Sequence, residues 1–473
     1  MKDASRTLFA IAVLIIIIGF LVPGAALPGR DGGRLGPLGG GKVWVARYDG
    51  ESHNLDQPVA IAVDSAGNVY VTGGSITSYK NWDYATVKYS SAGAQRWAKR
   101  YGFKTTGTGS KIDYAQGLAL DHSGNIYVTG ESADYNGWGN FATIKYLPNG
   151  KTGWLTRSAF GATNATNANC VAKALAVDWT GNVYVTGSRK FSNSWMDIAT
   201  AKYTTIGEEA WTRTFDGHDN LNDEGVAVGL DGSKNVYVAG YETTNLFGKN
   251  FKAIKYSNIG TMLWTKSYDG PSNDEDAATA LNIVHWGTGT YFATGIAVVG
   301  YSKDEVTDWD CVTRMFSANG KKLWTQRFTG SSGIEDVRPK GVTSDSAGNI
   351  YVAASGDCGG FFTLKYDSVG NLVWLRKYEG EENHDFAWAI AVDKAKNVYV
   401  TGQTQIGNSF DYITIKYDSA GNLIWDRRYD GTGHGNDWPK AIAVDNKGYV
   451  YVTGCSEGAG TLDDYLTIKY EAD

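Results

Sequence analysis

Four of the six histidines lie in segments that connect one sequence repeat to the next. Three of these segments lead into repeats that would be consecutive in a closed ring, and in each an aspartate follows one to three residues later: His53 with Asp56, His384 with Asp385, and His434 with Asp437. Imidazole nitrogens and carboxylate oxygens together form a ligand set suited to a transition metal. The three pairs could therefore converge on a divalent cation. The alternative is that they are separate, solvated loop residues.

A second group of residues places aromatic rings, several followed directly by a carboxylate, just ahead of a strand. Its members are Trp82 with Asp83, Trp138, Trp195, Trp309 with Asp310, and Phe410 with Asp411. An exposed ring can stack on a sugar while a neighbouring carboxylate accepts hydrogen bonds from its hydroxyls. These residues are therefore candidate contacts for a glycan or a peptide. The alternative is that the rings cover the strand ends and pack into neighbouring grooves.

Aspartate also recurs at the start of the first strand in most repeats, at Asp56, Asp113, Asp223, Asp276, Asp385 and Asp437. A residue present in nearly every repeat is more often needed to build the repeat than to bind a ligand. These carboxylates are expected to accept hydrogen bonds from loop N–H groups. The alternative is an acidic ring that attracts cations or a basic partner.

The elements that must position these residues are visible as eight repeats. Each repeat contains three strand-like segments, such as 60–63, 68–73 and 86–89, and a strand containing Trp precedes the first repeat and lies between the others. No such strand follows the last repeat, which ends at Tyr470. The pattern predicts an all-β, eight-bladed β-propeller over residues 43–473, with four antiparallel strands per blade. The strand at 43–48 completes the last blade, which closes the ring and leaves no unpaired edge.

Antiparallel pairing sorts the connecting segments onto two faces. The first-to-second and third-to-fourth strand turns are short and similar, as in 64–68 and 367–371, and contain Asp, Gly and Asn, which suit tight turns. The loops from second to third strand and from fourth strand to the next blade vary in length and chemistry. We call the face formed by these variable loops the upper face, and we expect ligands to bind there.

The repeated unit resembles a known family. The sequence A-I-A-V-D-x-x-G-N-V-Y-V-T-G, followed by D-Y-x-T-I-K-Y-D-x-x-G-N-L-x-W, is similar to the bacterial and archaeal SBBP β-propeller repeat from about residue 43 onward. That family is known mostly from secreted, lipoprotein and surface-layer proteins, and the resemblance implies no established catalytic residues. The stretch from Asp418 to Trp425 also resembles the tryptophan-docking motif of quinoprotein dehydrogenases, but its Asp-to-Gly spacing is one residue short.

The N-terminus predicts export. Lys2 and Arg6 precede an apolar run from residue 8 to 22, which is shorter than the roughly 20 residues of a membrane span. We expect a signal peptide at 1–26, an extracellular or cell-envelope location, a Gly-rich linker at 27–42 and no membrane span in the mature chain. An uncleaved anchor is the alternative. The net charge of −6 argues against nucleic acid as a partner.

Together these features predict a secreted or cell-surface module that binds a glycan or a cell-surface protein, or that serves as a structural unit. No catalytic residue is assigned, because the chain contains no recognisable catalytic or phosphate-binding motif. No cofactor is predicted apart from the divalent cation considered above, and the oligomeric state is not indicated. The alternative is an enzyme acting at the mouth of the central channel, as a glycan hydrolase or lyase or, less favoured, as a quinoprotein dehydrogenase.

Overall fold

The computed structural model describes residues 41–78, 81–103, 111–134, 137–160, 169–190, 195–245, 248–286, 293–304, 309–330, 336–357, 359–382 and 384–472. They belong to one compact unit, Leu38–Asp473, and form strands and turns. None of them forms a helix long and apolar enough to cross a membrane. The expected signal peptide and nearly all of the expected linker lie outside the described residues.

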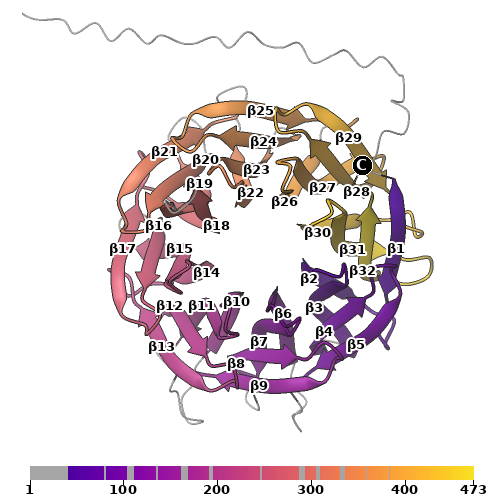
Figure 1. Ribbon diagram of the computed structural model, residues 1–473, viewed down its shortest axis with the longest axis horizontal. Helices are drawn as coiled ribbons and strands as arrows, with labels where there is room; N and C mark the ends of the chain where they lie inside the picture. Colours follow the sequence, from indigo (N-terminus) through magenta and orange to yellow (C-terminus); the bar gives the residue numbers. More distant parts are fainter. Residues whose placement is uncertain are drawn as a thin grey trace, which may run out of the picture. The chain divides into compact units, whose positions relative to one another are not determined.

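Thirty-two strands form eight blades of four antiparallel strands around a common centre, with the first strand of each blade innermost (Figure 1). Blades 1 to 4 consist of β2 (Asp56–Val63), β3 (Val69–Ser78), β4 (Asn81–Tyr89), β5 (Gln95–Tyr101); β6 (Lys111–Leu120), β7 (Ile126–Ala133), β8 (Gly139–Tyr146), β9 (Thr152–Ser158); β10 (Asn169–Val177), β11 (Val183–Lys190), β12 (Met196–Tyr203), β13 (Glu209–Phe215); β14 (Glu224–Leu230), β15 (Val236–Thr244), β16 (Gly248–Tyr256) and β17 (Met262–Tyr268).

Blades 5 to 8 consist of β18 (Asp276–Trp286), β19 (Ala293–Lys303), β20 (Trp309–Ser317), β21 (Lys322–Phe328); β22 (Val337–Ser344), β23 (Ile350–Gly356), β24 (Phe361–Tyr366), β25 (Leu372–Tyr378); β26 (Asp385–Val392), β27 (Val398–Ile406), β28 (Ser409–Tyr417), β29 (Leu423–Tyr429); β30 (Asp437–Val444), β31 (Val450–Glu457), β32 (Asp463–Tyr470) and β1 (Lys42–Tyr48). The predicted eight-bladed propeller is confirmed.

The ring closes as the sequence predicts. β1 pairs antiparallel with β32, from Trp44 opposite Lys469 to Tyr48 opposite Tyr465, and gives the sheet order β1-β32-β31-β30. Most blades are separate sheets, so no continuous sheet runs around the ring. Blades 1 and 2 alone share a sheet, through a two-residue parallel pairing of β4 with β6.

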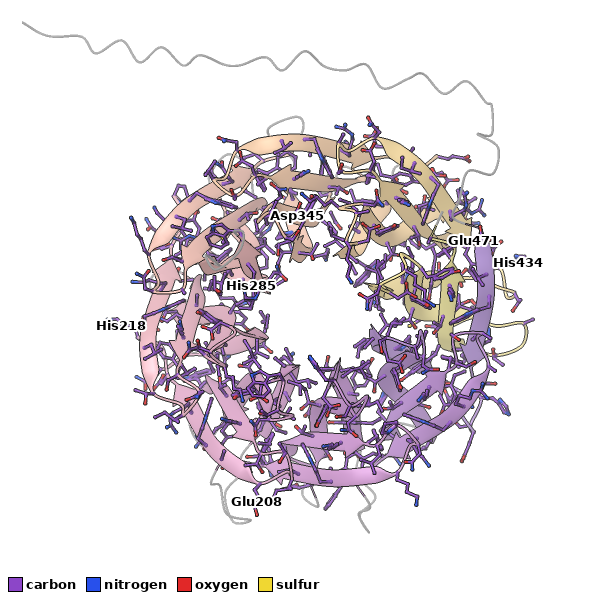
Figure 2. All side chains as sticks on the ribbon, in the orientation of Figure 1. Glu208, His218, His285, Asp345, His434 and Glu471 are labelled. Carbon is purple, nitrogen blue, oxygen red and sulfur yellow. The ribbon has the colours of Figure 1, made fainter. Side chains whose placement is uncertain are left out.

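The core consists of eight clusters, one between each pair of neighbouring blades. The second strands supply both sides of these clusters because their two faces are buried. In β3, Val69 and Val71 pack toward blade 8, whereas Tyr70 packs toward blade 2, and all three are fully buried. Side chains fill the spaces between blades all round the ring (Figure 2). No blade could bury its second strand alone.

The tryptophan of each fourth strand fastens one blade to the next. Trp374 lies between the rings of Tyr351 and Tyr417, with centroids 6.1 Å from each, and its indole N–H donates to Ser419 O at 3.3 Å. Its ring covers Gly421, where a Cβ would approach it to 2.8 Å. Gly421 also has a φ of +83°, so both contact and conformation favour glycine in that turn.

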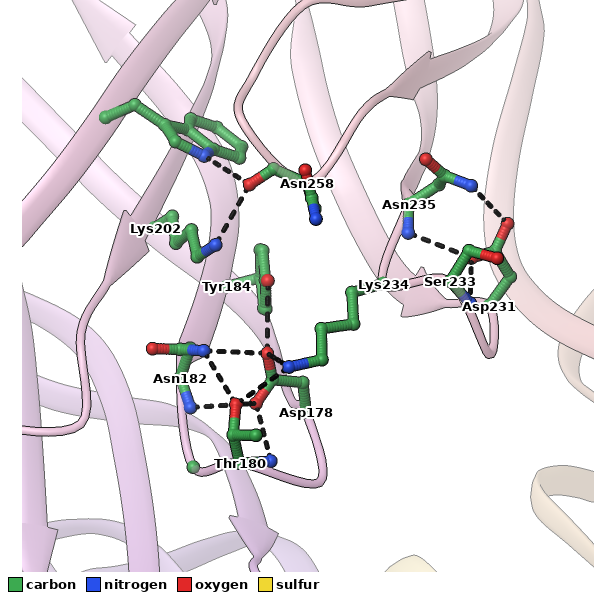
Figure 3. Close-up of polar contacts among 12 residues, drawn as sticks. Asp178, Thr180, Asn182, Tyr184, Lys202, Asp231, Ser233, Lys234, Asn235 and Asn258 are labelled. Atoms are coloured by element: carbon green, nitrogen blue, oxygen red, sulfur yellow. Dashed lines mark hydrogen bonds and ion pairs between the residues drawn. The ribbon is translucent and has the colours of Figure 1, made fainter.

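The Asp-containing turns are held by hydrogen bonds, as expected. In the turn after β10, Asp178 Oδ1 accepts the N–H of Thr180 at 2.9 Å and of Asn182 at 3.0 Å, and Lys234 of the next blade lies 3.4 Å from Oδ2 (Figure 3). Burial acts to raise the pKa of Asp178, but the hydrogen bonds outweigh it and lower the pKa to about 2.

We expect Trp374→Ala to lower the free energy of unfolding by about 3–5 kcal/mol, because it opens a cavity between two blades. Chemical denaturation measures the change. Trp179→Ala is the matched control: its ring is 67% exposed and contacts only Lys234 among the rings and cations described, 4.2 Å from the ring centroid, so its loss should cost less than about 1 kcal/mol. Equal effects of the two substitutions would contradict this account of the blade interface.

Candidate functional site

A buried polar tetrad lies at the upper-face end of blade 8. Asp437 of β30 is opposite Ser456 of β31, which is opposite Asp464 of β32. Arg47 of β1 donates to Asp464 Oδ2 at 3.0 Å and to Ser456 Oγ at 2.9 Å. The tetrad therefore links all four strands of the blade, including the strand that closes the ring.

The tetrad recurs in other blades. It consists of Asp56, Ser75, Asp83 and Arg100 in blade 1; Asp113, Ser132, Asn140 and Arg157 in blade 2; Asp276, Ser302, Asp310 and Arg327 in blade 5; and Asp385, Thr404, Asp411 and Arg428 in blade 7. The arginines were not identified from sequence. Their spacing from Trp is constant in these blades, and that regularity could have revealed them.

The first aspartate of the tetrad holds the loop that enters its blade. The N–H of Gly50 donates to Asp56 Oδ2, and the N–H of Gly431 donates to Asp437 Oδ2, both at 2.6 Å. Both carboxyl groups are fully buried, and burial raises their pKa values to about 6. This arrangement favours the structural interpretation of the repeated aspartates.

The structure places the candidate aromatic residues in different environments. Trp82 packs edge-on against Tyr114, with centroids 5.3 Å apart, and Trp309 packs edge-on against Tyr301 at 4.9 Å. Trp138 and Phe410 are half-buried, the latter near Phe386. Trp195 is 51% exposed.

The carboxylates that follow these rings in the sequence interact with arginines of their own blades, which the sequence analysis did not expect. Arg327 donates to Asp310 and Arg428 to Asp411, and both aspartates are fully buried. Asp83 lies 3.8 Å from Arg100. These three carboxylates therefore hold their own blades together. Their role as ligand contacts stays a prediction.

The candidate histidines interact with groups other than the aspartates that follow them in the sequence. His53 Nδ1 lies 2.6 Å from Asp49, and His434 Nδ1 lies 2.9 Å from Asp430, in both cases four residues upstream. The hydrogen bond to the carboxylate raises the pKa of each exposed imidazole. His384 Nδ1 lies 2.9 Å from the backbone oxygen of Glu382. Figure 2 places His218 and His434 on opposite sides of the ring.

Carboxylates alone come close enough to share an ion. Two triads have ligand oxygens within 4.8 Å of one another among the described residues: Asp49, Asp56 and Asp464 between blades 8 and 1, and Asp411, Asp430 and Asp437 between blades 7 and 8. All-oxygen sets suit Ca²⁺ or Mg²⁺ better than a transition metal. They include Asp56 and Asp437 of the expected metal set, whereas Asp385 and the histidines lie outside both triads. A bound divalent cation stays a prediction.

The corresponding junction between blades 3 and 4 departs from the tetrad. Cys170 stands where other blades have aspartate, Arg189 where they have serine or threonine, and Thr214 where they have arginine. The third position keeps Asp197. In the part of the chain that the structure describes, no ion pair is recorded for this carboxylate, although Arg189 lies opposite it and its charge favours the ionised form.

A pocket of about 590 Å³ opens at this junction, lined by Trp195, Asp197, Asp216, Asp219, Asn220, Leu221 and Asn245. The loop between β13 and β14 forms one side of it. Asn222 Oδ1 accepts the N–H of Met196 at 3.0 Å, and Asp219 Oδ2 accepts the N–H of Asn245 at 2.8 Å. These bonds fix the loop to both flanking blades and preform the pocket.

Two acids of this junction have raised pKa values. Burial, reinforced by the charge of Asp216, raises the pKa of Asp197 to about 6, although Arg189 acts in the opposite direction. Burial raises the pKa of Asp223, behind the pocket, to about 7. Sequence analysis named Trp195 here but not the loop residues. The combination of Asp197 with a missing fourth-strand arginine could have drawn attention to them.

Stability should depend on pH through the buried tetrads. The pKa of Asp437 is about 6 in the fold, above its ordinary value of 3.8. A carboxyl group of this kind stabilises the fold most below about pH 4 and loses that contribution as the pH rises through about 6. We expect Asp437→Asn to reduce the fall in unfolding free energy between pH 4 and 6, measured by urea denaturation.

The matched control for this experiment is Asp178→Asn. Because the folded pKa of Asp178 lies near 2, its contribution is present above about pH 4 and is lost only at lower pH. The slope between pH 4 and 6 should therefore match that of the unaltered protein. An unchanged slope in Asp437→Asn would show that its carboxyl group ionises normally in the fold.

Comparison with known proteins agrees with the fold. The SBBP β-propeller repeat family matches residues 44–79, 96–137 and 427–459. The uncharacterized WD repeat-containing protein L264 of Acanthamoeba polyphaga mimivirus is 26% identical in an alignment of 481 positions. The alignment covers 83% of this chain and 32% of that protein. The chain thus spans about a third of the length of this relative.

Solved structures with a similar fold have low sequence identity. The WD40 domain of SCAP from fission yeast matches with a TM-score of 0.45 and 10% identity, over 89% of this chain and 93% of that chain. The polysaccharide lyase Uly1 matches with a TM-score of 0.43 and 8% identity, over 79% and 93%. The chain is an all-β propeller protein that carries SBBP repeats.

Proposed function

We propose that this protein is a secreted or cell-surface binding module that takes a neutral or amino-bearing saccharide in the pocket between blades 3 and 4. A β-propeller of repeated blades serves as a binding or structural module, and its variable loops supply the binding residues. The basic and apolar segment at residues 2–22 supports export. The observation that carries the proposal is the exposed indole of Trp195 beside Asp197 in a preformed pocket.

The lining of the pocket combines the groups that sugars require. An indole offers a flat apolar surface for the C–H face of a sugar ring. Carboxylate oxygens accept hydrogen bonds from hydroxyl groups, and the Asn220 and Asn245 amides can both donate and accept. Because the loop is already tied to both blades, little ordering is needed on binding.

Charge narrows the class of saccharide. Three aspartates line the pocket, and no lysine or arginine occurs among its described lining residues. A uronic acid or sulfated sugar would bring like charge into this pocket, which disfavours binding. Neutral hydroxyl donors, or the ammonium group of an amino sugar, complement it instead.

A glycan array followed by calorimetry with the best ligand tests the proposal. We expect Trp195→Ala and Asp197→Asn each to weaken binding at least tenfold, which corresponds to about 1.4 kcal/mol. Trp179→Ala removes another exposed indole, in the turn after β10, and should leave affinity unchanged. Equal binding by all variants would place the ligand elsewhere. Silence across the array would leave a protein ligand or a structural role.

Asp197 also supports a second candidate function, the hydrolysis of a glycosidic bond at the same pocket. A carboxyl group with a pKa of about 6 can act as a general acid near neutral pH, and Asp216 supplies a second carboxylate close enough to influence it. The array ligand should be incubated with the protein and assayed for released reducing ends. Release abolished by Asp197→Asn would favour the enzyme, and an intact ligand would favour the binding module.

A further inference from the structure

A second feature of the ring lies far along the chain from the pocket, on the first strands of blades 6, 7 and 8. Figure 1 draws these strands, β22, β26 and β30, side by side at the inner edge of the ring. Each contains a register shift against its second strand, which leaves one residue without a Cα partner. The unpaired residues are Lys340, Trp388 and Lys440. The first strands of the other five blades have the same register shift, so what distinguishes blades 6, 7 and 8 is the type of residue at the bulge.

These three side chains form one cluster. Lys340 Nζ lies 5.6 Å from the centroid of the Trp388 ring, and Lys440 Nζ lies 3.5 Å from it. The indole N–H donates to Gln403 Oε1 at 2.9 Å, which fixes the ring. Arg338, two residues before Lys340 on β22, stacks on Trp309 at 4.6 Å.

The cluster carries positive charge, and one acid, Asp463, acts on Lys440 without forming an ion pair with it. Within the described residues, Arg338, Lys340 and Lys440 make no ion pair, although the whole chain has a net charge of −6. The bulged lysine of blade 3 behaves differently: Lys173 Nζ lies 2.9 Å from Glu224. A lysine at this bulge therefore does not always lack an ion pair, and blades 6 and 8 differ from blade 3 in this respect.

The positive charges of these residues also repel one another. Burial lowers the pKa of Lys340, and the charge of Arg338 lowers it further. Burial lowers the pKa of Lys440 as well; Lys340 acts in the same direction, whereas Cys455 and Asp463 oppose it. An anion placed among these groups would gain attraction from all of them and relieve their mutual repulsion.

We propose that Lys340 and Lys440, with Trp388 between them and Arg338 alongside, form a binding site for an oxyanion such as a carboxylate or sulfate group. The bulges present the two ammonium groups from blades 6 and 8, on either side of blade 7, and the indole of blade 7 offers an apolar surface to the body of the molecule that carries the anion. The site is separate from the acidic pocket of blades 3 and 4 and does not depend on its function.

Isothermal titration of the full protein with sodium sulfate, glucuronate and glucose tests the site. Sulfate and glucuronate should bind and glucose should not. Glucuronate binding would identify an acidic saccharide as a source of the anion, and binding of sulfate alone would identify a free inorganic anion. No binding of either anion by the unaltered protein would overturn the proposal.

The variant K340Q/K440Q should lose at least tenfold in affinity for the anion. Its control is K394Q/K447Q, which removes the same charge from two exposed lysines in turns that follow β26 and β30. Equal losses in both variants would show that only net charge matters and would overturn the site. Trp195→Ala should leave anion affinity unchanged, which separates this site from the saccharide pocket.

A measurement on the unaltered protein tests the site without relying on the folding of a variant. Lysine acetylation followed by mass spectrometry, with and without sulfate, should show protection of Lys340 and Lys440 but not of Lys394 and Lys447. Equal reactivity of Lys340 and Lys440 in both conditions would contradict the proposal.

Discussion

Burial between blades is the interaction on which the rest of the molecule depends. The second strands are apolar on both faces, so each blade needs a neighbour on either side. Eight blades satisfy this need only when the ring is closed, and closure rests on the pairing of β1 with β32. Arg47 reinforces that pairing from within, since it joins β1 to Asp464 and Ser456. The upper-face loops, the pocket and the inner strands all take their positions from this closed ring.

The tetrads show how the charged residues of a repeat can change position. In blade 4, Glu242 takes the place of serine, and Lys252 of the same blade lies 2.8 Å from it, both nearly buried. In blade 3 the basic residue moves from the fourth strand to the second, as Arg189. A buried charge must find a partner nearby, so acid and base change together. In blade 3 this leaves Arg189 directly opposite Asp197, which lines the pocket.

Much of the fold could be predicted from sequence because it depends on patterns that repeat. The Asp-containing turns follow from local turn chemistry. The eight blades and the closure of the ring follow from counting the Trp-containing strands, one of which precedes the first repeat. The candidate site could not be predicted to the same degree. Whether Trp82 or Trp195 is exposed depends on the side chains that the neighbouring blade supplies, as Tyr114 of blade 2 packs against Trp82 of blade 1. His53 binds an aspartate upstream rather than downstream because its loop turns back, with a φ of +49°.

The closing contact has a consequence for the order of folding. Arg47 and Ser456 are 409 residues apart in the chain, so this contact cannot form until β31 has been synthesised. Early blades can assemble with one another, but blade 1 keeps an uncovered face and β1 has no partner until β32 emerges. The ring can therefore close only after β32 has been made and has paired with β1.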